Sequence, residues 1–127
     1  MLSIIFMPDY SKDLIAASSI PLILSVLSKQ ESYGYEIIRT IREASNKELE
    51  FAEGTIYPIL KKMEEKKLII SKWKKAKNDR ERKYYRLTSY GRKQLSMEKN
   101  NWSFINSILQ SLWQPQTLSS SLQLRTG

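Results

Sequence analysis

The chain has 127 residues, is 41% hydrophobic and carries 21 Lys and Arg residues against 13 Asp and Glu residues, which gives a net charge of +8. This length predicts one domain with its own core, and the charge favours a polyanionic partner such as nucleic acid or an anionic membrane surface. The lack of cysteine and histidine excludes disulfides and thiolate chemistry, and it removes the commonest general base and metal ligand.

Residues 1–10 are expected to be an N-terminal extension. Their apolar start has no basic segment before it and is cut short by Pro8, so it does not read as a signal peptide. The longest uncharged run, residues 14–28, is too short to span a bilayer. We therefore expect a cytoplasmic protein with no membrane partner.

Two helices are predicted next, within an expected DNA-binding domain over residues 11–88. Apolar residues between positions 10 and 29 indicate a first helix in two pieces, because Pro21 removes one backbone hydrogen bond and predicts a kink or a restart. Residues 30–33 read as a polar connection. The second helix opens at residues 33–36, ends at residues 44–47 and has a buried stripe of Ile37, Ile38 and Ile41.

A third helix is predicted from about Glu53 to Lys66. Its apolar residues recur at the i, i+3, i+4 and i+7 positions of one stripe, formed by Ile56, Ile59, Leu60 and Met63. Ala52 precedes this helix where a capping Ser, Thr, Asp or Asn is preferred, which costs about 1 kcal/mol.

A basic hairpin should follow the third helix directly. Residues 68–70 and 82–87 have the composition of strands, and residues 77–80 supply the turn. Seven basic residues lie within positions 72–83: Lys72, Lys74, Lys75, Lys77, Arg80, Arg82 and Lys83. The order of helix and then hairpin is that of a winged helix.

Thr88 and Ser89 can cap a long helix from Tyr90 to about Trp113. Its apolar residues fall near one stripe that the helix cannot cover alone, so a second copy of the chain could cover it. We therefore expect residues 89–113 to be a dimerisation helix and residues 114–127 to be a disordered tail. The predicted fold class is mainly α with a small β-hairpin, a winged helix-turn-helix with a long C-terminal dimerisation helix.

The third helix and the hairpin together favour contact with DNA. A major groove admits one helix with its N-terminal residues at the base edges, which are here Gly54, Thr55, Tyr57 and Pro58. Lys61 and Lys62 lie one turn further along, toward the phosphates. Two simpler interpretations remain open: the lysines can keep an edge hairpin soluble, and Tyr57 can be a packing residue.

Three ordered segments resemble the PadR family of bacterial transcriptional regulators. They are residues 33–38 (YGYEII), residues 53–64 (EGTIYPILKKME), and residues 82–88 (RKYYRLT) with Gly91. The resemblance runs from about Ile20 to Trp113, and Ala52 departs from it where members often have a capping Ser or Asn. It implies a dimeric winged helix-turn-helix that represses promoters, in which the third helix reads DNA and the hairpin is the wing.

From the residues and the resemblance together, we expect the partner to be double-stranded DNA with a palindromic operator. The expected DNA-binding residues are Tyr35, Gly54, Thr55, Tyr57, Pro58, Lys61, Lys62, Lys75, Lys77, Arg80, Arg82 and Lys83. The expected dimer interface comprises Leu14, Ile105, Leu109 and Leu112.

Trp102 looks like the tryptophan with which some multidrug-responsive family members bind planar aromatic compounds between two subunits. Two stacked indoles can form such a slot, although Trp102 can equally be dimer core alone. The leading hypothesis is thus a homodimeric repressor relieved by a small aromatic effector. The alternatives are a small-molecule (drug) binding protein and a dimeric adaptor, each with incidental DNA affinity.

Neither an enzyme nor a cofactor or metal site is expected. The acidic pairs Glu64 and Glu65, and Asp79 and Glu81, are adjacent on a helix or solvated among lysines, so they do not form an acid/base pair. The sequence has no glycine-rich phosphate loop and no nucleophile with an evident base.

Overall fold

The computed structural model describes residues 12–75 and 77–115. The expected N-terminal extension and all but the first two residues of the expected tail lie outside these residues. The chain divides after Ser96 into an N-terminal unit, residues 1–96, and a C-terminal unit, residues 97–127. Among the described residues, no helix has the length and apolar character needed to cross a membrane.

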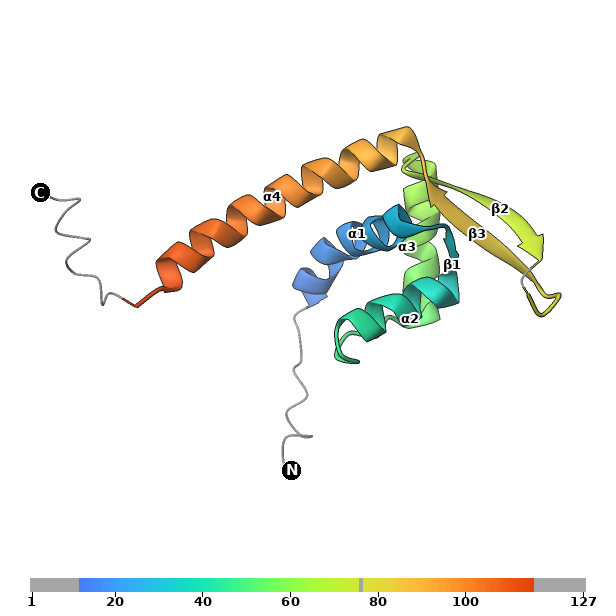
Figure 1. The fold of residues 1–127 in the computed structure, drawn as a ribbon, viewed down its shortest axis with the longest axis horizontal. Helices are drawn as coiled ribbons and strands as arrows, with labels where there is room; N and C mark the ends of the chain where they lie inside the picture. The colour runs from blue at the N-terminus through green and yellow to red at the C-terminus, as the bar shows by residue number, and fades with distance from the viewer. Residues whose placement is uncertain (1–11, 76, 116–127) are drawn as a thin grey trace, which may run out of the picture. The chain divides into compact units, whose positions relative to one another are not determined.

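The described residues form helices and strands in the predicted order (Figure 1). These elements are α1 (Lys12–Lys29), β1 (Ser32–Tyr33), α2 (Gly34–Ala44), α3 (Glu53–Glu65), β2 (Ile69–Lys75), β3 (Glu81–Leu87) and α4 (Ser89–Trp113). Helices α2 and α3 form the helix-turn-helix, and strands β2 and β3 form the wing. The predicted winged helix-turn-helix is therefore confirmed, including the long last helix.

Helix α1 is continuous, with Pro21 inside it. The predicted restart at Pro21 is therefore wrong. In the second half of the helix, after the proline, Ile23, Leu24 and Leu27 are buried. Their packing favours continuation of the helix past Pro21, although the proline donates no backbone hydrogen bond.

The sheet has three antiparallel strands in the order β1-β3-β2. The wing pairs from Ile69 opposite Leu87 to Lys75 opposite Glu81. Strand β1, expected as a polar connection, places Ser32 opposite Tyr85 and Tyr33 opposite Tyr84. It thereby ties the start of α2 to the wing.

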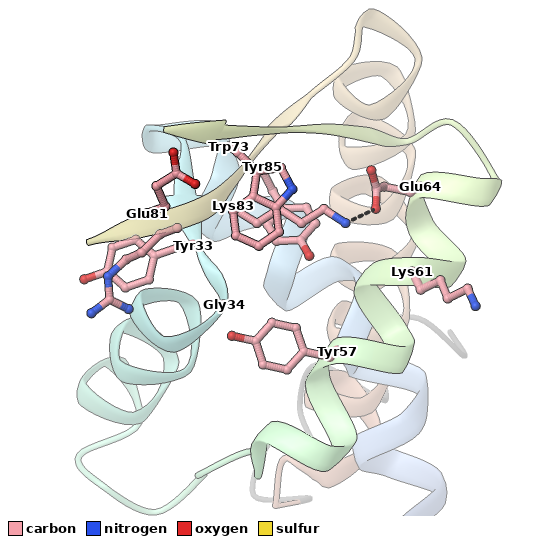
Figure 2. Close-up of a pocket in the computed structure, with 10 residues that line it drawn as sticks. Tyr33, Gly34, Tyr57, Lys61, Glu64, Trp73, Glu81, Lys83 and Tyr85 are labelled. Carbon is pink, nitrogen blue, oxygen red and sulfur yellow. Dashed lines mark ion pairs between the residues drawn. The ribbon is translucent and has the colours of Figure 1, made fainter. Parts of the chain in front are cut away.

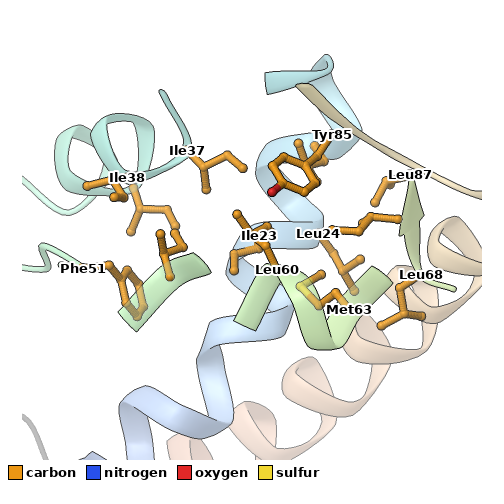
Figure 3. Close-up of a cluster of buried hydrophobic side chains, with 14 of the residues drawn as sticks. Ile23, Leu24, Ile37, Ile38, Phe51, Leu60, Met63, Leu68, Tyr85 and Leu87 are labelled. Carbon is orange, nitrogen blue, oxygen red and sulfur yellow. The ribbon is translucent and has the colours of Figure 1, made fainter. Parts of the chain in front are cut away.

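One core holds the three helices and the base of the wing together (Figure 3). It contains the expected stripe of α3, in which Ile56, Leu60 and Met63 are fully buried while Ile59 is partly buried. The other helices and the sheet supply Ile23, Leu24, Leu27, Ile37, Ile38, Ile41, Ile69, Tyr85 and Leu87, with Phe51 from the loop before α3, Leu68 from the connection between α3 and β2, and Leu95 from α4. Packing of this face leaves the opposite face of α3 to solvent.

The start of α4 is fixed to the base of the wing by Thr88. The Gly91 N–H donates to Thr88 Oγ1 at 2.9 Å, so Thr88 caps the helix as predicted. The same hydroxyl donates to the carbonyl of Lys67 at 2.7 Å, and the Thr88 N–H donates to the carbonyl of Leu68 at 3.1 Å. A Cβ at Gly91 would fall on that Leu68 carbonyl, so the close approach requires glycine.

Candidate nucleic-acid interface

The outer face of α3 is solvent-exposed over its whole length. All six residues expected to contact DNA from this helix are exposed: Gly54, Thr55, Tyr57, Pro58, Lys61 and Lys62. The N-cap residue Ala52 makes no side-chain hydrogen bond to the helix. The N-terminal end of the helix therefore leaves backbone N–H groups without a side-chain cap. A Cβ added at Gly54 in this first turn would meet nothing within 4 Å, so the space beside it is open.

Tyr57 both packs and remains accessible. Its ring end lies against Gly34 at the start of α2, so closely that a Cβ at Gly34 would overlap the Tyr57 hydroxyl (Figure 2). The side chain is nevertheless 42% exposed. Burial raises the pKa of the Tyr57 hydroxyl, Glu53 adds to this effect and Arg82 opposes it, so the hydroxyl is a neutral donor at pH 7. Packing and DNA reading are therefore compatible at this residue.

The end of the wing presents the expected basic residues to solvent. Lys75, Lys77 and Arg80 are all exposed. Asp79 has a positive φ of 67° and pairs with Lys75 at 3.7 Å, while Asn78 Oδ1 accepts from the Arg80 N–H at 3.1 Å. The turn is thus shaped by its own Asn and Asp residues.

Arg82 and Lys83 are less accessible than the rest of the expected set. The Arg82 guanidinium lies 4.3 Å from the centre of the Tyr33 ring, and its Nε is buried without a hydrogen-bond partner among the described residues. The Lys83 ammonium lies 3.6 Å from a carboxylate oxygen of Glu64. Both cations therefore make contacts within the N-terminal unit, which the sequence did not indicate.

A cavity of about 620 Å³ separates α3 from the wing and the start of α2 (Figure 2). Its lining combines aromatic and charged side chains: Tyr33, Tyr57, Trp73, Tyr85, Lys61, Glu64, Glu81, Arg82 and Lys83, with Gly34. Sequence reasoning missed Trp73, which is 62% exposed on β2. Its position opposite Lys83 in the strand register places it on the same side of the wing as Ser71 and Tyr85.

Tyr35 lies at the beginning of α2 and is 49% exposed. The Arg39 guanidinium lies 5.6 Å from the centre of its ring, one helical turn further along. This contact places a cation beside an exposed phenol on the helix that precedes α3. Arg39 was not among the expected DNA-binding residues.

The C-terminal unit exposes a broad apolar face on α4. The expected interface residues Ile105 and Leu112 are 49% and 71% exposed, Leu109 is intermediate, and Trp102 is exposed with its indole N–H donating to Glu98 at 3.2 Å. Sequence reasoning missed four further exposed residues of this helix: Met97, Phe104, Ile108 and Trp113. In the N-terminal unit, Leu14 is 49% exposed.

Comparison with known proteins gives one consistent result. Residues 23–97 match the sequence model of the PadR-like family of transcriptional regulators. A protein from Lysinibacillus sphaericus, itself uncharacterized, is 30% identical over 97 residues, which cover 76% of this chain and 89% of the relative.

Solved structures of family members have the same fold. A PadR-like transcriptional regulator from Bacillus cereus is 30% identical with a TM-score of 0.74, over 82% of this chain and 99% of that one. A PadR family regulator from Clostridium difficile is 37% identical with a TM-score of 0.69, over 76% and 99%. The family match covers the helix-turn-helix, the wing and the start of α4, so this chain belongs to the PadR-like family, whose members are transcriptional regulators and not enzymes.

Proposed function

We propose that the protein is a homodimeric repressor that binds a palindromic operator and releases it when a small aromatic effector binds. One observation carries the DNA-binding part of this proposal. The exposed face of α3, with Thr55, Tyr57 and two lysines, lies in the same unit as a hairpin whose end exposes Lys75, Lys77 and Arg80. Such a pair of elements suits one major groove and the adjacent phosphates.

The residues of this surface divide by chemistry into base and phosphate contacts. Thr55 can touch a thymine methyl or donate to a phosphate, and the Tyr57 hydroxyl can donate to a base edge. Lys61 and Lys62 on α3 and the three cations at the end of the wing would neutralise phosphates. Tyr35 and Gly54 would lie at the edge of this contact, where the backbone can approach the DNA.

A dimer follows from the apolar face of α4. In the described part of the C-terminal unit, Trp102, Ile105 and Leu112 expose large apolar side chains, which a second copy would cover. A two-fold dimer would place its two reading helices about 34 Å apart, one turn of the duplex. Acting on chromosomal DNA, it would work in the cytoplasm.

A gel-shift experiment tests the proposal directly. The purified protein is titrated against the promoter region upstream of its own gene and against a random duplex of equal length at physiological salt. We expect preferential binding of the promoter, a footprint with two-fold symmetry and reduced transcription from that promoter in vitro. Equal affinity for both duplexes would refute sequence-specific DNA binding.

The effector part rests on Trp102 and has its own test. A planar cationic dye should quench tryptophan fluorescence in the wild type and in Trp73→Phe, and should fail to do so in Trp102→Ala. The Trp73 variant is the matched control, because Trp73 lines the cavity beside the wing. Unchanged operator affinity with dye bound would show a small-molecule binding protein without a switch.

A further inference from the structure

Glu64 connects the reading helix α3 to both strands of the wing. Its Oε2 accepts a hydrogen bond from the Ser71 hydroxyl of β2 at 2.5 Å, and its Oε1 lies 3.6 Å from the Lys83 ammonium of β3. Figure 2 shows the carboxylate and the ammonium facing each other between the helix and the wing. One side chain therefore spans the junction of the two elements expected to contact DNA.

The location of Glu64 on α3 explains why it reaches the wing. It lies seven residues after Tyr57, which is about two helical turns, so both side chains occupy the same flank of the helix. Both line the cavity beside the wing. Lys61 lies between them on this flank and also lines the cavity, whereas Lys62 lies on a different side of the helix. Neither lysine has a carboxylate within ion-pair distance in the described part of the chain.

Lys83 differs from the cations at the end of the wing in burial and in the strength of its pairing. The side chains of Lys83 and Glu64 are 37% and 29% exposed, whereas those of Lys75 and its partner Asp79 are 65% and 85% exposed. A lysine in a solvent-exposed ion pair readily exchanges its carboxylate partner for a DNA phosphate, because water screens the lysine–carboxylate and the lysine–phosphate contacts equally. A half-buried carboxylate that Ser71 also holds in place is a stronger competitor for its lysine.

We propose that Glu64 holds the Lys83 ammonium away from the DNA phosphates, so that Lys83 positions the wing against α3 and does not neutralise a phosphate. This inference rests on the proposed DNA binding and refines it. The wing would contact phosphates through its exposed end alone. The distance between those contacts and the groove contacts of α3 would be set by the Glu64 pairing.

The salt dependence of DNA binding measures this directly, because each neutralised phosphate contributes about 0.9 to the slope of log K against log salt. Glu64→Gln keeps an acceptor for Ser71 but removes the charge that holds Lys83. Both protomers of the proposed dimer carry the substitution, so we expect its slope to be steeper than wild type by about 1.8, or about 12-fold more affinity lost between 50 and 200 mM salt. The double variant Glu64→Gln/Lys83→Gln should return to the wild-type slope.

Three controls make the outcomes decisive. Glu65→Gln removes a charge from the same helix without touching Lys83 and should leave the slope unchanged. Lys62→Gln and Lys75→Gln, present in both protomers, should each make the slope shallower by about 1.8, and if neither does so the proposed DNA surface fails. If they do, any one of three results overturns the role given to Glu64. These results are an unchanged slope in Glu64→Gln, a slope shallower than wild type in the double variant, and a steeper slope in Glu65→Gln. Circular dichroism melting establishes that each variant is folded.

Discussion

Replacing Gly34 with alanine should move Tyr57 and thereby change the face of α3 that we propose reads DNA. An added Cβ at Gly34 would lie 2.6 Å from Cε1 and 2.5 Å from Cζ of the Tyr57 ring. Both distances are well inside the van der Waals contact of two carbons. Since the ring is the far end of a side chain that is 42% exposed, it can swing outward without a shift of either backbone.

The magnitude follows from two opposing effects. Overpacking costs about 1–3 kcal/mol, and alanine gains about 0.5–1 kcal/mol over glycine within a helix, less at its first residue. Gly34→Ala should therefore lower the free energy of unfolding by about 0.5–2 kcal/mol. In a Tyr57→Ala background the clash is absent, so the same substitution should be neutral or slightly stabilising. The propensity gain is the same in both backgrounds, so the coupling between the two sites is the overpacking cost itself, about 1–3 kcal/mol.

Urea unfolding of the wild type, the two single variants and the double variant measures this coupling. Gel shifts with the operator and with single-base variants of it measure recognition in parallel. We expect Gly34→Ala to change which base substitutions are tolerated, because the displaced ring lies on the proposed reading face. A Gly34→Ala cost that is the same with and without the Tyr57 ring would refute the contact.

Three further predictions concern the cap, the core and the wing. Gly91→Ala should destabilise the protein by at least about 1–3 kcal/mol in urea unfolding, because its Cβ would meet the backbone carbonyl of Leu68 and not a movable side chain; a neutral effect would contradict this packing. Burial, with smaller contributions from Glu64 and Tyr57, raises the pKa of the Tyr85 hydroxyl to about 12. The neutral phenol therefore stabilises the fold below pH 10, and this stability should be lost as the pH rises through about 12; Tyr85→Phe should lack that decline in alkaline unfolding curves. Lys75→Gln should weaken binding to operator and random duplexes alike, whereas a loss confined to the operator would assign Lys75 to base recognition.

The helices and the wing were predictable wherever a periodic pattern extends over several turns or alternates along a strand. The stripe of α3 and the composition of residues 82–87 locate this helix and the wing within a few residues. Of the kink or restart predicted at Pro21, the restart was wrong, because the burial of Ile23 and Leu24 outweighs one missing hydrogen bond. The strand β1 has two residues, too few for any periodicity.

The candidate site was predictable as a surface but not as a set of contacts. The exposed residues of α3 follow from its buried stripe, since one face of a helix implies the other. The pairing of Glu64 with Ser71 and Lys83 could not be predicted, because it depends on how the wing folds back beside the helix. The contact of Tyr57 with Gly34 could not be predicted either, because the two residues are 23 positions apart in the sequence.

The hydroxyl of Thr88 couples the first turn of α4 to the root of the hairpin. It accepts from the Gly91 N–H in the first turn of α4, and it donates to the carbonyl of Lys67 where the chain passes from α3 into β2. Any rotation of the first turn of α4 must therefore either drag the root of the hairpin with it or break these hydrogen bonds. Together with the chain itself and the packing of Gly91 and Leu95, this threonine would carry mechanical strain from the first turns of α4 to the hairpin.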